Sequence, residues 1–513
     1  MRKLVTILNT AVLLVLLTAC GSSNNDTPPA STQLIYGSGD YTSINPALYE
    51  HGEINLLLFA GLTRHDADNN VVPGLAESWT YDEATMTYTF TLRDALTFHD
   101  GQPLTSADVK FTLEVIMNPA NGSENESNFE EIASIDTPDD LTVVIRLSTP
   151  SVAMPDYLAI GILPKHILDG QDVPISPFNQ NPIGSGPYKL VDWDMGQSIT
   201  MERFDAFYLG APNIDRIIFK IVPDYSARAL QMRAGELTLA QITPRDAEAL
   251  RNSNSYVVYY MDTADYRGIM YNFNNPFWQQ HPGLPAALSF AIDRNAVVRS
   301  VLLGRGQAAW SPIQKSAYVN DAIEKYDYNP AKAQAAIEAF GWAKGSDGYY
   351  AKDRQQLAFA ISVSSTEPVR IDMANIAAQN LQDIGVNATV DIVARIDWRD
   401  QHASLIGWGS PFDPDDHTYK VFGTGKGANY SWYSNAEVDR ILTEARSTVD
   451  RSQQLALYKE FQEVFSGDPA YTFIAYIDAI YIAKPELKGI NPNTTLGHHG
   501  VGIFWNVHEW TLG

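Results

Sequence analysis

One stretch joins a strand pattern to a helix pattern and reads Phe98-His99-Asp100-Gly101-Gln102-Pro103-Leu104-Thr105-Ser106-Ala107-Asp108-Val109. The alternating residues Thr87–Arg93 precede it and are typical of a half-buried strand. Within the stretch, Ser106 or Asp108 can cap a helix that runs to about Met117. Strand and helix patterns alternate in this way along the chain, so we predict a mixed α/β fold.

Later segments predict further helices and another strand. Leu284–Leu303 has the period of a long amphipathic helix, and Gly304 would end it. Arg370–Asp383 predicts a second helix, which Gly385 would end. The strand pattern Ala388–Val393 follows directly, which supports the α/β prediction.

Length and composition limit the class of protein. The chain has 513 residues, which allows about two to four domains at roughly 150 residues each. Apolar residues make up 45% and charged residues 19%, a globular composition that argues against a disordered or polytopic membrane protein. The formal charge of −24 repels polyphosphate, so we expect no nucleic-acid partner.

The chain contains a single cysteine, Cys20. An internal disulfide and a cluster of thiolate metal ligands are therefore both excluded. Arg2 and Lys3, followed by the mostly apolar Leu4–Leu17, are typical of a secretory signal, which we place at residues 1–19. The apolar run is too short for a spanning helix, which needs about 20 residues.

The end of this signal suggests what the cysteine does. Leu17-Thr18-Ala19-Cys20 resembles a bacterial lipobox, in which the cysteine thiol receives diacylglycerol and becomes the first residue after cleavage. We expect residues 20–32, which are polar and rich in proline, to form a flexible tether between the lipid and the body. An ordinary signal with an incidental cysteine is the alternative.

Several motifs, in a fixed order along the chain, carry a family resemblance. They are Pro73–Trp79, Tyr88–Arg93, Phe98–Val109, Asn181–Tyr188, Ala291–Arg294 and Pro330–Trp342. Together they resemble the bacterial extracellular solute-binding proteins of the peptide/nickel family, family 5, which supply ABC importers. The resemblance covers nearly the whole chain after the signal.

The resemblance implies a two-lobed clamp of the type II periplasmic-binding-protein class. Its parts would be lobe I at residues 33–270 with an inserted subdomain at about 70–200, lobe II at residues 271–484, and a return to lobe I at residues 485–513. The chain would then cross between lobes near Tyr266–Asn274 and near Lys484–Gly489.

The resemblance also implies a function. Such a protein captures a small ligand between its lobes and delivers it to the permease subunits of an ABC importer. The sequence contains no P-loop, no GxSxG elbow and no HExxH helix, so we predict no enzymatic activity and no cofactor. We expect a monomer held by lipid at the outer face of the cytoplasmic membrane. A hydrolase that draws carboxylates from distant parts of the sequence is the alternative of another class.

The segment Ile406–His417 bears on the ligand. In peptide-binding relatives, an Asp soon after the matching Trp pairs with the α-amine of the peptide, but this chain has Pro411 near that place. Its form resembles the nickel-binding branch, which implies pocket-wall roles for Trp408 and Phe412. Asp413 is a further candidate for the ligand pocket. The alternatives are that Trp408 belongs to the core and that Asp413 braces the turn.

A pair of histidines near the end of the chain also favours nickel. His498 and His499 lie between Gly497 and Gly500, where they could converge in a turn. Imidazole suits Ni²⁺, but two ligands are not a full shell. Some nickel-binding relatives add an N-terminal histidine, which implies His51 as the third ligand. A histidine pair without a metal role, and a His51 that binds nothing, are the alternatives.

One residue is a candidate for holding a chelator. Val421–Gly427 lacks a histidine that one nickel-binding subgroup has, and Met154–His166 lacks the arginines with which that subgroup grips carboxylates. Arg267, at the expected hinge, could take that role. We therefore expect nickel as the transported ligand, carried with a small chelator such as histidine. The alternative is a dipeptide or oligopeptide.

Overall fold

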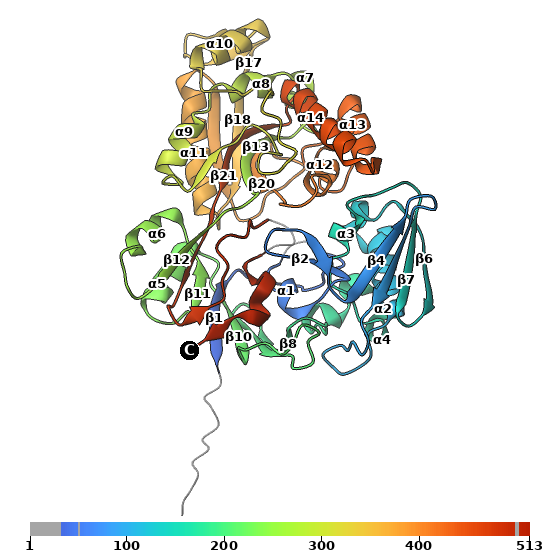
Figure 1. Ribbon diagram of the computed structural model, residues 1–513. Helices are drawn as coiled ribbons and strands as arrows, with labels where there is room; N and C mark the ends of the chain where they lie inside the picture. The colour runs from blue at the N-terminus through green and yellow to red at the C-terminus, as the bar shows by residue number, and fades with distance from the viewer. Residues whose placement is uncertain (1–31, 50–51, 498–501) are drawn as a thin grey trace, which may run out of the picture. The chain divides into compact units, whose positions relative to one another are not determined.

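A computed structural model describes residues 32–49, 52–497 and 502–513 (Figure 1). The predicted signal, Cys20 and all but the last residue of the predicted tether lie outside these ranges. Within them, no helix is both long and apolar enough to span a bilayer. The described chain is built on two large sheets, and we call the body around each sheet the first and the second lobe.

The first lobe is built on a seven-stranded sheet that takes strands from distant parts of the chain. Its order is β12 (Val257–Met261), β22 (Ala479–Ala483), β11 (Leu239–Gln241), β1 (Gln33–Ser38), β10 (Arg216–Ile221), β9 (Ser198–Arg203) and β8 (Tyr188–Asp194). Strand β1 pairs in parallel with β10 and β11, whereas β22 pairs antiparallel with β11 and β12. The late strand β22 therefore completes the first lobe.

Short elements surround this sheet. They are α1 (Asn55–Leu58), β2 (Thr63–His65), β3 (Val71–Pro73), η3 (Val173–Ile175), η4 (Pro177–Gln180), α5 (Tyr225–Arg233), α6 (Pro244–Leu250), β23 (Leu487–Lys488), η5 (Ile503–Glu509) and β24 (Thr511–Leu512). The core of the lobe includes Tyr36 of β1, Phe219 of β10 and Phe504 of η5, whose rings pack within 5.4 Å of one another.

The first lobe carries a subdomain with a sheet of its own. Its antiparallel order is β4 (Ala76–Asp82), β5 (Thr87–Leu92), β7 (Thr142–Leu147) and β6 (Ile132–Asp139). The helices with it are α2 (Ser106–Met117), η1 (Pro119–Asn121), η2 (Glu126–Asn128), α3 (Met154–Tyr157) and α4 (Lys165–Leu168). Helix α2 begins with a capping box, because the side chains of Thr105 and Asp108 each bond the other's backbone N–H.

The second lobe is built on a six-stranded sheet (Figure 1). Its order is β14 (Gly306–Ala308), β21 (Tyr471–Ile477), β13 (Tyr266–Tyr271), β20 (Ala403–Trp408), β18 (Ala358–Ser364) and β19 (Asn387–Val393). The other elements are α7 (Pro276–Gln280), α8 (Leu284–Ser289), α9 (Arg294–Ser300), α10 (Pro330–Ala339), β15 (Ala343–Lys344), β16 (Tyr350–Lys352), β17 (Gln355–Gln356), α11 (Pro368–Asp383), α12 (Asp415–Phe422), α13 (Ala436–Ser447) and α14 (Arg451–Gly467).

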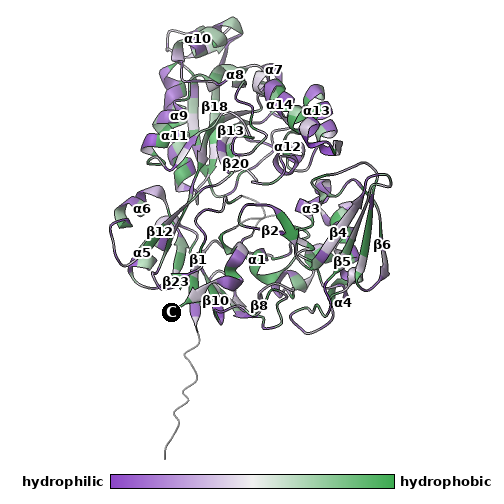
Figure 2. Ribbon diagram, in the orientation of Figure 1, coloured by the Kyte–Doolittle hydropathy of each residue, from purple (hydrophilic) through white to green (hydrophobic). Residues whose placement is uncertain are grey.

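Both faces of this sheet are covered. Because side chains alternate along a strand, Ile269 and Tyr271 of β13 enter one core while Tyr266 and Met270 enter the other. The first core includes Met373 of α11, and the second includes residues of α12, α13 and α14. The central strands of both lobes are accordingly mostly green, for hydrophobic residues, in Figure 2.

The chain passes between the sheets at two places. It leaves the first sheet after Met261 and enters the second at Tyr266, and it returns at Asp478 between β21 and β22. Both places lie a few residues before the crossings that the resemblance implied. The inserted sheet of the subdomain runs from Ala76 to Leu147, inside the expected span of about 70–200.

The long helix predicted over Leu284–Leu303 is wrong, because the structure divides it into α8 and α9. The side chain of Asp293 accepts a hydrogen bond from the backbone N–H of Ala296 at 2.8 Å and so starts a new helix. The Arg294 guanidinium then turns inward and donates to the carbonyl oxygens of Phe473 and Tyr326. The predictions for Arg370–Asp383 and Ala388–Val393 are confirmed as α11 and β19.

Candidate functional site

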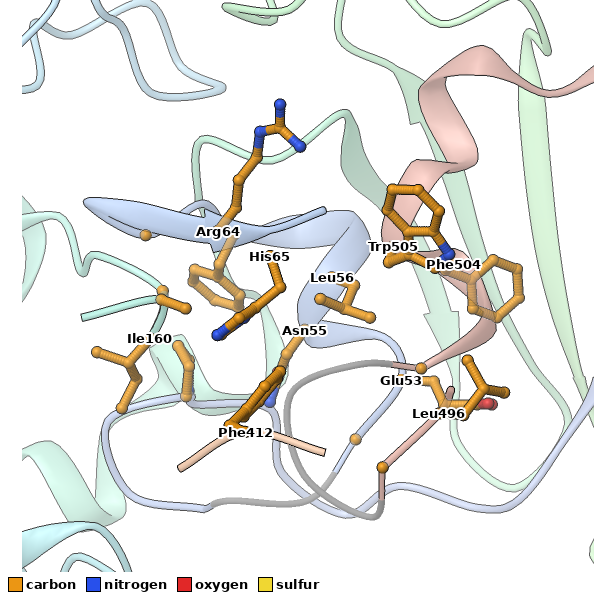
Figure 3. Close-up of a pocket in the computed structure, with 18 of the residues that line it drawn as sticks. Glu53, Asn55, Leu56, Arg64, His65, Ile160, Phe412, Leu496, Phe504 and Trp505 are labelled. Carbon is orange, nitrogen blue, oxygen red and sulfur yellow. The ribbon is translucent and has the colours of Figure 1, made fainter. Parts of the chain in front are cut away.

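A cavity of about 430 Å³ is lined by residues of both lobes. The first lobe contributes α1, β2 and η5 together with the loops next to them. The second lobe contributes Phe412, two arginines and three acidic residues: Arg267, Arg370, Asp265, Glu367 and Asp416. Figure 3 shows Phe504 and Trp505 of η5 on one side and the pair of His65 and Phe412 on the other. A volume of this size is within the range of sites for small molecules, about 300–1,000 Å³.

An aromatic stack joins the two lobes at the wall of the cavity. The ring of His65, at the end of β2, lies against the ring of Phe412, with centroids 3.6 Å apart and planes inclined by 13°. Nε2 of His65 is 2.9 Å from Oδ1 of Asp156, in α3. Asp156 therefore orients the imidazole, and the imidazole supports the phenyl ring from the second lobe.

The wall that the second lobe contributes places each of its two arginines beside a carboxylate that also lines the cavity, and Nη2 of Arg267 is 3.8 Å from Oδ2 of Asp265. Arg267 projects from β13, and its Nη1 donates to the carbonyl oxygen of Tyr266 at 2.8 Å. Burial, reinforced by the nearby Arg370, lowers the pKa of Arg267 to about 10, so the guanidinium stays charged at neutral pH. Nε of Arg370 is 3.6 Å from Oε2 of Glu367. Guanidinium groups at such a wall can hold a carboxylate.

Glu53 anchors the segment before α1 to the first sheet. Its Oε2 accepts a hydrogen bond from the Tyr36 hydroxyl at 2.6 Å, and its Oε1 accepts one from the Tyr481 hydroxyl at 3.0 Å. Burial raises the pKa of the Glu53 carboxyl. Tyr36 lies on β1 and Tyr481 lies on β22. This side of the cavity is therefore bonded to one strand from the beginning of the described chain and to one from near its end.

The predicted histidine ligands His51, His498 and His499 lie outside the described residues. The residues that flank them are described, and they line the cavity: Tyr49 and Gly52 on either side of one segment, and Gly497 and Gly502 on either side of the other. The two segments also come close to each other, because a Cβ placed on Gly502 would lie 3.5 Å from Cγ of Glu53.

The other predicted pocket residues fall into two groups. Phe412 and Arg267 line the cavity, but Trp408 and Asp413 are not among the lining residues. Trp408 follows Gly407 on β20, and its side chain packs in the core between the sheet and the helices α12, α13 and α14. This placement agrees with the alternative that Trp408 belongs to the core.

Asp413 lies in a hydrogen-bond network behind the cavity. Its carboxylate accepts from the hydroxyls of Tyr318 and Tyr458 at 3.1 and 3.2 Å, from Nε2 of Gln454 at 3.1 Å and from the backbone N–H of Asp415 at 3.0 Å. Burial, with Asp415 adding to it, raises its pKa to about 7. These bonds brace the turn before α12, as the alternative interpretation of Asp413 has it.

A second polar connection between the lobes surrounds Arg446 of α13. Its Nη1 is 3.0 Å from Glu130 and 3.1 Å from Glu131 in the first lobe, and its Nε is 3.1 Å from Asp415 in the second. The hydroxyl of Tyr157, in α3, donates to Asp415 as well. Burial raises the pKa of Glu131 to about 7, although the charge of Arg446 opposes this rise.

Several of these residues could not be identified from the sequence. His65, Asp156 and Arg370 belong to no motif, and Glu131 and Arg446 are brought together only by the meeting of the lobes. Among residues 32–49, 52–497 and 502–513, no group of three or more His, Cys, Asp or Glu side chains could hold a metal ion. His417 belongs to no such group, and it is buried beside the ion pair of Asp416 and Lys420.

A family model described as "Bacterial extracellular solute-binding proteins, family 5 Middle" matches residues 70–430. The chain belongs to this family of solute-binding proteins. The family recognition made from the motifs is therefore confirmed, and so is the mixed α/β fold of a type II periplasmic-binding protein.

Solved structures and curated relatives agree on this family but differ in what they bind. NikZ from Campylobacter jejuni, solved in complex with Ni(L-His), is 35% identical, with 94% of this chain and 99% of that chain covered and a TM-score of 0.90. AppA from Bacillus subtilis, solved in complex with a nonapeptide, is 28% identical, with 94% and 99% covered and a TM-score of 0.86. The dipeptide-binding protein of Escherichia coli is 26% identical over 92% of this chain and 94% of its own length.

Membership of the family establishes the general function. The protein is a substrate-binding protein of an ABC importer, and such proteins work with permease subunits in the periplasm or outside the cell. Its relatives are binding proteins rather than enzymes. The relatives include peptide-binding proteins and proteins solved with nickel chelates, so the family alone leaves the ligand open.

Proposed function

We propose that this protein captures nickel as a chelate with a small molecule such as histidine and delivers it to an ABC permease. The metal is cargo and not a resident cofactor. His51, His498 and His499 supply the imidazole ligands, and the chelator completes the coordination shell.

The convergence of two distant segments on one cavity carries this proposal. Tyr49 and Gly52 flank the segment that contains His51, Gly497 and Gly502 flank the segment that contains the histidine pair, and all of the flanking residues line the same cavity. The chain has its only cysteine at position 20, so a transition-metal site in the body must use imidazole and oxygen ligands.

The two arginines of the second lobe support a chelator with a carboxylate. Arg267 and Arg370 line the same cavity as the flanking residues. An amino acid such as histidine can bind nickel through its amine and imidazole while a guanidinium holds its carboxylate. We therefore assign Arg370, with Arg267 behind it, to the chelator rather than to the metal.

One comparison and the volume of the cavity support nickel over a long peptide. NikZ, whose structure holds Ni(L-His), is 35% identical to this chain, whereas AppA, whose structure holds a nonapeptide, is 28% identical. A cavity of about 430 Å³ also suits a metal chelate better than a nonapeptide. A dipeptide is the second candidate, because the relatives include a dipeptide-binding protein and the cavity has room for a ligand of that size.

The proposal includes an anchor. Cys20 carries the lipid, residues 20–32 form the tether, and the body works as a monomer at the outer face of the cytoplasmic membrane. Two or more acyl chains give stable anchoring. A Cys20→Ala variant released into the medium would support the anchor, and a variant that stays in the membrane fraction would refute it.

Calorimetric titration of the protein without its signal tests the nickel site. Ni²⁺ is added with and without L-histidine to the wild type, to a His498→Ala/His499→Ala variant and to a His166→Ala control, whose histidine is exposed and lies outside the cavity. We expect a dissociation constant below about 10 µM for the wild type with L-histidine, and a loss of at least about tenfold in the double variant only. Equal affinity in the wild type and the double variant would refute the histidine pair as ligands.

A further inference from the structure

A second cavity lies in the second lobe and shares no lining residue with the cavity described above. Its volume is about 920 Å³, and its walls are the loop between β19 and β20 and the loop between α12 and α13. The first loop contributes Arg395, Trp398 and Arg399, and the second contributes Tyr430 and Trp432.

Aromatic rings are arranged in a column along this cavity. The rings of Trp398 and Tyr430 are stacked, with centroids 4.9 Å apart and planes inclined by 18°. Trp408 continues the column behind Tyr430, with ring centroids 6.2 Å apart and planes inclined by 24°. Trp432 is 38% exposed and has a φ of 51°, a backbone conformation that is unusual for a bulky side chain. Trp398 at the end of the column and the exposed Trp432 are therefore the two rings on which a ligand in this cavity could stack.

Buried amide side chains fix both walls. Nδ2 of Asn272, which is fully buried, donates to the carbonyl oxygens of Arg399 and Gln401 at 2.9 and 2.8 Å. Nδ2 of Asn429 donates to the carbonyl oxygens of Gly423 and Tyr433 at 2.9 and 2.8 Å. The aromatic faces are thus held by the fold before any ligand arrives, which lowers the entropic cost of binding.

Two positive charges at this cavity have no carboxylate partner among the described residues. Arg395 and Arg399 are exposed and form no ion pair within the described part of the chain. Asp397 stands between them, but its Oδ1 accepts hydrogen bonds from the backbone N–H groups of Arg399 and Asp400. Two free guanidinium groups on a chain with a formal charge of −24 favour an anionic ligand.

We propose that this second cavity binds an aromatic carboxylate, whose ring lies on Trp398 and Trp432 and whose carboxylate meets Arg395 and Arg399. Rings stack on aromatic side chains, and guanidinium groups bind carboxylates in a bidentate geometry. The ligand is either a free aromatic acid or the C-terminal aromatic residue of a peptide. This site is independent of nickel, so it can be tested apart from the proposed function.

Calorimetry and ligand-observed NMR with three probes test the proposal. The probes are 2-naphthoate, its neutral amide 2-naphthamide, and the peptide Gly-Gly-Gly-Trp with a free carboxylate. We expect an Arg395→Gln/Arg399→Gln variant to weaken binding of the naphthoate about fivefold or more and to leave naphthamide unchanged. Tighter binding of the peptide than of naphthoate would assign the ligand to a peptide end, and the reverse order would assign it to a free acid.

A matched control separates the site from general charge. Arg233→Gln/Arg299→Gln removes two exposed arginines that form no ion pair in the described chain and lie outside both cavities. Trp398→Leu should weaken both naphthalene probes, and nickel binding should stay unchanged in every variant. Equal binding of naphthoate and naphthamide, equal losses in the two arginine variants, or no binding of naphthoate below about 1 mM would overturn the proposal.

Discussion

Phe412 of the second lobe lies flat on His65 of the first lobe, with ring centroids 3.6 Å apart and planes inclined by 13°. Asp156 holds the imidazole from behind at 2.9 Å. Because both rings line the cavity, closure of the lobes and formation of the cavity wall depend on the same contact. Ligand affinity should therefore respond to changes at Phe412.

Phe412→Leu keeps an apolar side chain but removes the ring that stacks on His65. We expect the dissociation constant for the nickel–histidine complex to rise about fivefold, because an aromatic pair contributes about 0.5–1.5 kcal/mol beyond its buried area. Titration calorimetry measures the change. Phe340→Leu, at a phenylalanine that is exposed in the same lobe, is the control and should bind as the wild type does. Wild-type affinity in Phe412→Leu would contradict a role for the stack.

Arg446→Met removes the cation that joins Glu130 and Glu131 to Asp415 across the lobes. Breaking a buried pair in this way leaves uncompensated carboxylates and costs about 3–5 kcal/mol. Each lobe keeps its own core, so we expect the lobes to separate before they unfold. Small-angle scattering of the ligand-free protein should give a larger radius of gyration.

Arg440 on the same helix provides the control for Arg446. It pairs with Glu437, Glu444 and Glu460, and all of them belong to the second lobe. Arg440→Met should leave the radius of gyration unchanged. The same radius for Arg446→Met and the wild type would show that these ion pairs do not hold the lobes together.

The buried carboxyl of Glu131 predicts how stability depends on pH. Burial raises its pKa from 4.5 to about 7 in the folded protein. The folded state therefore holds the proton more tightly than the unfolded state, so this contribution to stability is complete below about pH 4.5 and is lost as pH rises through about 7.

Glu131→Gln mimics the protonated form at every pH. We expect its melting temperature to fall by less than that of the wild type between acidic and mildly alkaline buffer, and scanning calorimetry at several pH values measures this difference. Glu83→Gln, at an exposed glutamate between β4 and β5, is the control. If the melting temperatures of the wild type and Glu131→Gln changed in parallel with pH, the raised pKa of Glu131 would be contradicted.

Arg370→Gln tests the assignment of Arg370 to the carboxylate of a chelator. We expect the affinity for nickel with L-histidine to fall about tenfold, because a hydrogen bond to a charged group contributes about 1.5–3 kcal/mol. Nickel with histamine, which has no carboxylate, should bind the wild type and the variant alike. Equal losses for the two chelates would mean that Arg370 acts on the cavity in general and not on a carboxylate.

The architecture followed from the sequence because local patterns and ordered motifs determine it. The helices α2 and α11 are local features, and both lie where the sequence predicts them, although the N-cap of α2 is Thr105 and not Ser106 or Asp108. The division of Leu284–Leu303 was missed because Asp293, an ordinary polar position in the helical period, caps a new helix.

The wall of the cavity was harder to predict. The motif around Trp408 suggested a pocket residue. Alternation along β20 instead directs its side chain into the core that the sheet shares with α12, α13 and α14. The contact of His65 with Phe412 joins residues far apart in the sequence, and no spacing rule connects them. Arg267 was predicted from its place near the hinge, whereas Arg370 required the fold to bring the start of α11 to the same wall.

Native mass spectrometry of the protein, purified from cells grown with nickel, is the most direct test of the ligand. We predict a bound mass that equals nickel plus at least one histidine, carries the isotope pattern of nickel and disappears in the His498→Ala/His499→Ala variant. A bound population with peptide masses and no nickel would contradict the account and would make this protein a peptide carrier.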